Sequence, residues 1–201
     1  MSVDLRSCGQ GPYIMAAPIA FLIFAAGTLF SLLYSPTWEL NNLSALGASK
    51  DSVTAITFGV SCFVAGVLVA TFGVGKMLFE RGLDRMAGFF FILGGFGLLM
   101  VGMFDANSLE LHNMVTRFFA FTMVMAISLA SFADILQGDM VILVACILML
   151  IIILAQWPIF TGALTECVAI ALASIWSFLQ TAKYQNRGAL CSYLPHRTSA
   201  E

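Results

Sequence analysis

The sequence predicts an all-α membrane protein, built as a single bundle of six transmembrane helices. Of its 201 residues, 60% are hydrophobic and only 10% are charged, whereas about a quarter of the residues of a soluble domain are charged. Long apolar runs without period-2 alternation favour helices, because isolated strands would leave backbone groups unpaired in lipid. The net charge of -2 gives no polybasic signal, so the partners expected are membrane lipids and not nucleic acid.

A span needs roughly 20 mainly apolar residues to cross a hydrocarbon core about 30 Å thick. Six segments meet this requirement, at 13–34, 53–75, 87–104, 112–135, 140–157 and 163–182. Turn residues separate them, with Pro36 after the first span, Gly138 between the fourth and fifth, and Pro158 after the fifth. The first run is too long for the apolar part of a secretory signal, so we expect it to be retained. With no Pro/Ser-rich linker, residues 1–201 are predicted to be one transmembrane domain.

Lysine and arginine predict the orientation, because they are enriched in short cytoplasmic loops. With six spans, both tails lie on the same side as the second and fourth loops. That side carries seven basic residues, namely Arg6, Lys76, Arg81, Arg85, Lys183, Arg187 and Arg197. The other side carries only Lys50 and Arg117. We therefore expect a multi-pass protein of the cell membrane with both termini in the cytoplasm.

The outward-facing loops carry most of the unusual polar residues and so predict a site on the outer face. Its candidate ligand-binding residues are Ser44, Gly47, Asp105, Glu110, His112, Arg117 and Glu166. Glu166 is distinctive because it lies about one turn, or roughly 5 Å, inside the sixth span. At that depth a carboxylate faces the bundle, finds a donor or is protonated; alternatively, it is hydrated at the interface.

The candidate catalytic residues in this group are His112, Asp105 and Glu166. A histidine held by a carboxylate acts as a general base, for example in ester hydrolysis. Asp105, Glu110, His112 and Glu166 together offer oxygen ligands and one imidazole to a divalent metal, although their spacing matches no defined ligand motif and no cofactor is identified. The structural alternative is that Asp105 caps a short helix while His112 hydrogen-bonds a neighbouring loop.

Small residues recur on one face of the second span, at Ser61, Ala65 with Gly66, and Ala70. Such stripes let two helices approach closely. They predict a packing seam within the bundle.

Two segments carry a family resemblance. Ser44-Ala45-Leu46-Gly47 follows the first span, and Gly102-Met103-Phe104-Asp105 with Leu111-His112 lies between the third and fourth. Both resemble elements of a prokaryotic six-helix membrane family of unknown function that groups with the DRAM and Frag-type proteins, although Asp105 stands where many members have Pro. The resemblance implies a six-helix bundle with both termini inside and an outer polar site that includes Ser44, Gly47, Asp105 and His112. It also implies a lipid-related ligand, but no reaction.

Three functions fit these observations. The first is a membrane protein whose outer-face site binds or processes a lipid or lipid-linked ligand. The second is a non-catalytic accessory subunit that contacts protein partners in the membrane. The third is a hydrolase that uses His112 with a carboxylate, so enzymatic activity remains open. An ion transporter is not favoured, because the span centres offer only Ser, Thr and Gly as polar residues.

Overall fold

A computed structural model describes residues 11–35, 43–104, 109–156 and 162–193. The described chain is helical and contains no strand, which confirms the all-α class. Its elements are α1 (Gly11–Ile14), α2 (Ala16–Tyr34), the 3-10 helix η2 (Leu43–Ala48), α3 (Ser52–Phe79), α4 (Gly82–Met103), α5 (Leu109–Leu136), α6 (Met140–Gln156) and α7 (Ala163–Tyr193).

Five of these helices contain stretches that are long and apolar enough to cross a membrane. The stretches are Ala16–Tyr34, Ser52–Phe79, Gly82–Met103, Glu110–Leu136 and Thr165–Gln185. The remaining predicted span forms α6, a helix of 17 residues, which at about 1.5 Å per residue is roughly 25 Å long. Five membrane-length helices are therefore present in the described chain, and α6 is a shorter apolar helix.

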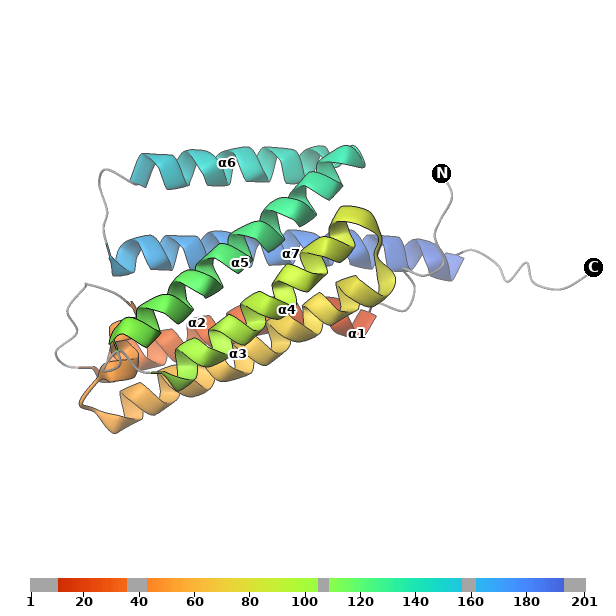
Figure 1. Ribbon diagram of the computed structural model, residues 1–201. Helices are drawn as coiled ribbons and strands as arrows, with labels where there is room; N and C mark the ends of the chain where they lie inside the picture. Colours follow the sequence, from red (N-terminus) through yellow and green to blue (C-terminus); the bar gives the residue numbers. More distant parts are fainter. Residues whose placement is uncertain (1–10, 36–42, 105–108, 157–161, 194–201) are drawn as a thin grey trace, which may run out of the picture.

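Figure 1 shows how the helices run between the two ends of the bundle. One end carries η2 and the starts of α3, α5 and α7; we call it the His112 end. The other carries α1, the α3–α4 and α5–α6 turns and the end of α7; we call it the Lys76 end. Helix α6 runs at the edge of the bundle beside α5 and α7. The first and last described helices thus meet at the Lys76 end.

The helices extend beyond the predicted spans at the connection between the second and third spans. The second span was predicted at about 53–75 and the third at about 87–104, and the helices that contain them run to Phe79 in α3 and from Gly82 in α4. The two helices are joined by a tight turn in which Gly82 has a positive φ of 56°, a conformation that suits glycine. Lys76, expected in a loop, therefore lies inside α3.

Helices α3 and α4 pack with their backbones almost in contact, because glycines face each other across the seam. A Cβ on Gly66 would lie 2.6 Å from the carbonyl oxygen of Gly95, and a Cβ on Gly73 would lie 2.6 Å from that of Gly88. A third pair, Gly59 and Gly102, makes the same contact. The pairs recur every seven residues, so the same edge of both helices stays in contact over four turns. Of the small residues predicted to form a seam, Gly66 and Ala70 lie in this one, whereas Ser61 lies against Gly27 of α2.

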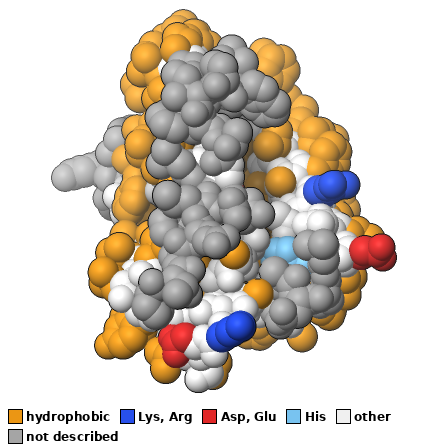
Figure 2. Space-filling model, turned by 90° about the vertical axis from the view of Figure 1, so that its left-hand side faces the viewer, with side chains coloured by type: hydrophobic (Ala, Val, Ile, Leu, Met, Phe, Trp, Pro, Cys, Tyr) orange, Lys and Arg blue, Asp and Glu red, His pale blue; other side chains and the backbone are white. Residues whose placement is uncertain are grey.

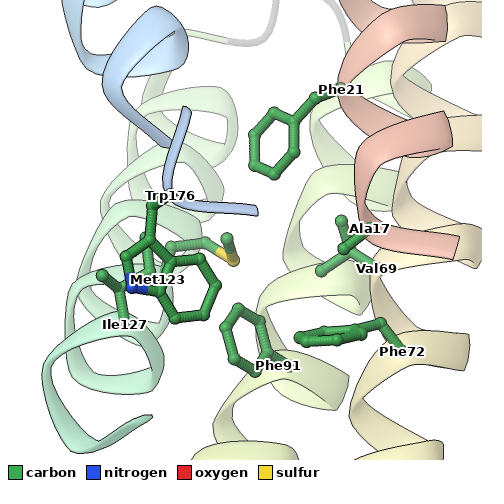
Figure 3. A pocket seen from close by; sticks show the side chains of 8 residues that line it. All are labelled: Ala17, Phe21, Val69, Phe72, Phe91, Met123, Ile127 and Trp176. Carbon is green, nitrogen blue, oxygen red and sulfur yellow. The ribbon is translucent and has the colours of Figure 1, made fainter. Parts of the chain in front are cut away.

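Aromatic side chains fill the centre of the bundle. Phe91 of α4 stacks on Trp176 of α7 with ring centroids 5.6 Å apart, and it meets Phe72 of α3 edge-on at 5.0 Å. Figure 3 shows these rings converging with side chains from α2 and α5 around a small apolar hollow. The lining residues are Ala17, Phe21, Val69, Phe72, Phe91, Met123, Ile127 and Trp176. These contacts fix the helices that carry the polar residues at both ends.

Candidate functional site

His112 lies in the first turns of α5, and only 4% of its surface is exposed. Its Nδ1 is 2.8 Å from the carbonyl oxygen of Phe104, at the end of α4. Because a carbonyl only accepts, Nδ1 carries the proton and donates. The other ring nitrogen, Nε2, is 3.5 Å from the hydroxyl of Thr116. These contacts favour a role for His112 in joining α4 to α5, in line with the structural alternative.

Glu166 enters the same region from α7. Its Oε2 accepts a hydrogen bond of 2.7 Å from the backbone N–H of Leu43, the first residue of η2. Glu166 also lies near His112. The bond to Leu43 joins residues 123 positions apart in the chain. Glu166 is therefore a carboxylate that has found a donor within the bundle.

The short helix η2 brings Ser44 and Gly47 to this end of the bundle. Its side chains Leu43 and Leu46 are buried, whereas Ser44 and Gly47 are half-buried. A Cβ added at Gly47 would lie 3.4 Å from the ring of Phe58 on α3. Helix η2, His112 and Glu166 thus lie at the same end of the bundle, as expected for alternate loops of an up-and-down bundle. Asp105 lies outside the described residues.

Figure 2 looks onto the His112 end and shows charged side chains near its rim, with the histidine ring recessed between them. Lys50, Glu110 and Arg117 are exposed. Neither Lys50 nor Arg117 forms an ion pair with any described residue. The His112 end therefore carries two exposed cationic side chains, Lys50 and Arg117.

The structure describes three of the four proposed metal ligands. Glu110 is exposed on α5, His112 is buried, and Glu166 bonds to η2. Within residues 11–35, 43–104, 109–156 and 162–193, no three His, Cys, Asp or Glu side chains come together as metal ligands. Asp105 belongs to none of these ranges, so the full set of four stays a prediction.

Asp51 follows Lys50 in the chain and is the N-cap residue of α3. Its Oδ2 accepts hydrogen bonds from the hydroxyl of Thr54 at 2.6 Å and from the backbone N–H of Thr54 at 3.0 Å. These bonds hold the pKa of the Asp51 carboxyl below its ordinary value of 3.8. Because the folded pKa is the lower one, the capping stabilisation is complete above pH 3.8 and is lost as the pH falls through the folded value.

We expect Asp51→Ala to expose the first turn of α3 to amide hydrogen exchange at neutral pH, since Ala is a poor N-cap. Asp51→Asn should keep most of the protection, because Asn also caps helices, and it should remove the acid-dependent loss. The measurement is exchange of the Val53 and Thr54 amides in detergent micelles between pH 7 and pH 3. Equal exchange in all three proteins at pH 7 would contradict a capping role.

A second polar group lies at the Lys76 end, where sequence reasoning expected only loop residues. Lys76 and Asp84 face each other across the α3–α4 turn with Nζ and Oδ1 2.5 Å apart, and their side chains are only 3% and 4% exposed. The Lys76 ammonium also donates to the hydroxyl of Tyr184 on α7, at 3.0 Å. This buried ion pair therefore ties α3, α4 and α7 together.

Asp134 and Lys183 form the neighbouring pair, between α5 and α7. Asp134 is 1% exposed and also accepts from the side-chain amide of Gln180. Lys183 lies 3.5 Å from Asp139, the residue that caps α6. One signal in the sequence points to the first pair: Lys76 and Asp84 are eight residues apart on either side of a short turn, which places them opposite each other. No such local signal exists for Asp134 and Lys183.

Comparison with known proteins gives no match to a family model, to a curated protein or to a solved structure. The resemblance to the six-helix family thus stays a prediction. The fold and composition define the class at a coarser level. The chain is a helical bundle with five helices long and apolar enough to span a membrane, and these features suggest a multi-pass membrane protein.

Proposed function

We propose that the protein is a six-span protein of the cell membrane whose outer, His112 end binds the head group of a phospholipid. The termini are proposed to be cytoplasmic, at the Lys76 end. The path of α6 beside α5 and α7 supports a sixth crossing. The seven-to-two distribution of basic residues supports the orientation.

The observation that carries the lipid proposal is the pair of exposed cations, Lys50 and Arg117, which form no ion pair within the described part of the chain and lie at an end otherwise surrounded by apolar helix surface. Lysine binds phosphate as a point charge, and arginine binds it through two N–H groups. A phospholipid is the ligand whose phosphate and apolar chains match both surfaces.

His112 and Glu166 have a positioning role in this proposal. Through Phe104 and Leu43, they hold the end of α4 and the helix η2 in place. Ser44 and Gly47 lie on η2 and are held with it. The closed environment of His112 supports binding more than hydrolysis, because a general base needs reach to its substrate.

Titration of the purified protein with palmitoyl-oleoyl phosphatidylglycerol, read by native mass spectrometry, tests this function. We expect Lys50→Gln and Arg117→Gln each to weaken lipid binding by about fivefold, since a charge-assisted contact to phosphate contributes roughly 1 kcal/mol at a screened surface. The matched control is Arg85→Gln, which removes an exposed arginine at the Lys76 end. An equal loss in all three variants, or no loss in any, would refute a head-group site at the His112 end.

A further inference from the structure

The short helix α1 lies between α3 and α7 at the Lys76 end. Tyr13 packs directly on Gly75 of α3, because a Cβ added at Gly75 would lie only 2.4 Å from the Cβ of Tyr13. The Tyr13 ring also meets the ring of Phe79, with centroids 5.7 Å apart. On the other side, the hydroxyl of Thr181 on α7 lies 3.5 Å from the carbonyl oxygen of Ile14. Helix α1 therefore bridges α3 and α7.

The residues that α1 contacts are close neighbours of the buried ion pair. Gly75 directly precedes Lys76 in α3, and Thr181 is three residues before Tyr184 in α7. The Lys76 ammonium donates to the Tyr184 hydroxyl between these two helices, and both side chains are buried. Ile14 of α1 is buried as well. Helix α1 thus lies beside the contact between Lys76 and Tyr184 and helps to exclude water from it.

Further into the bundle, α7 carries more buried polar side chains, namely Ser177, Gln180 and Thr181. The side-chain amide of Gln180 donates to the Asp134 carboxylate, but its carbonyl oxygen has no hydrogen-bond partner among the described residues. Burial of such an oxygen is costly, and a water molecule that reaches it removes the cost. Entry of water from the Lys76 end would therefore satisfy a group that the closed bundle leaves unsatisfied.

We propose that α1 is a strap that closes the Lys76 end, and that its displacement admits water to the Lys76–Asp84 pair and on to Gln180. The strap is held by a ring contact, by packing on a glycine and by a long hydrogen bond. It can therefore detach while the α3–α4 seam stays closed. The path for water ends at Trp176, which is buried and stacked on Phe91, so water enters from one end only.

The test is acetylation of lysine in the full chain, purified in detergent micelles, with the exposed Lys50 as internal standard. Sulfo-N-hydroxysuccinimide acetate is the reagent, and peptide mass spectrometry gives the modification rates of Lys76 and Lys50. In the wild type Lys76 should react far more slowly, because the reagent reaches it only in the open state. Gly75→Ala, whose methyl group displaces Tyr13, should raise the Lys76 rate about tenfold relative to Lys50, as expected for loss of an aromatic contact and its burial. Tyr13→Ala should do the same.

Val74→Ala is the matched control, because it creates the same residue one position earlier, at an exposed site on α3. It should leave the Lys76 rate unchanged. Alanine is a better helix former than glycine, so Gly75→Ala does not weaken α3 itself. Circular dichroism at the labelling temperature checks that each variant keeps its helix content, and if one strap variant unfolds, the other decides.

Three results would overturn the strap. The first is a wild-type Lys76 that reacts as fast as Lys50. The second is a Lys76 rate that stays at the wild-type value in the folded Gly75→Ala and Tyr13→Ala proteins. The third is an equal rise in Val74→Ala, which would indicate general loosening of α3. No lipid is added in this experiment, so its outcome is independent of the head-group proposal.

Discussion

Replacement of Lys76 by methionine is expected to destabilise the bundle by about 3–5 kcal/mol. The substitution keeps the apolar length of the side chain but leaves the Asp84 carboxylate buried without its counter-ion. It also removes the donor to Tyr184. Thermal unfolding in a mild detergent, followed by circular dichroism, should show a transition at clearly lower temperature.

The double variant Lys76→Met with Asp84→Leu provides the control. When both charges are removed no buried charge is left unpaired, and buried pairs replaced by apolar residues are often neutral in stability. We expect the double variant to recover most of the loss. If it is as unstable as the single variant, Lys76 stabilises the bundle by some means other than its pairing with Asp84.

Gly66→Ala is expected to destabilise the α3–α4 seam by about 3 kcal/mol, at the upper end of the usual cost of overpacking. The added methyl group would lie 2.6 Å from the Gly95 carbonyl oxygen and 2.8 Å from the backbone nitrogen of Leu99. Because both neighbours are backbone atoms of a packed helix, the clash is relieved only if the helices separate. The measurement is thermal unfolding, together with the elution profile on size exclusion.

Val67→Leu is the matched control for the seam. It adds one methylene at the next position of α3, where the side chain is 44% exposed. This variant should unfold at the wild-type temperature. If Gly66→Ala unfolds at the same temperature as Val67→Leu and the wild type, the two helices can separate at the seam without loss of stability.

The sequence predicted the helices well because their signal is local. A long run of apolar residues marks a span without reference to any neighbour. The six predicted segments are helical where the structure describes them, apart from Met15 between α1 and α2 and Phe104 after α4. The helices run past the predicted spans at their ends, because the apolar run stops before the helix does. Lys76 is buried inside α3 with its ammonium bonded to Asp84 and Tyr184, and no hydropathy count detects these partners.

The candidate site was predicted in part, by topology. Alternating loops must meet at one end of a bundle, so Ser44, His112 and Glu166 were expected together. The particular contacts were beyond prediction because they depend on tertiary geometry. Glu166 bonds to a backbone amide 123 residues away, and no pattern in the sequence specifies that partner. The seam depends likewise on Gly59 and Gly102 meeting across two helices.

The most direct test of lipid binding at the His112 end is native mass spectrometry of the wild-type protein released gently from its own membrane. The account predicts a population that carries the added mass of a single phospholipid, retained under conditions that strip detergent, and reduced in Lys50→Gln but not in Arg85→Gln. A wild-type protein seen only at its bare mass under those conditions would contradict it.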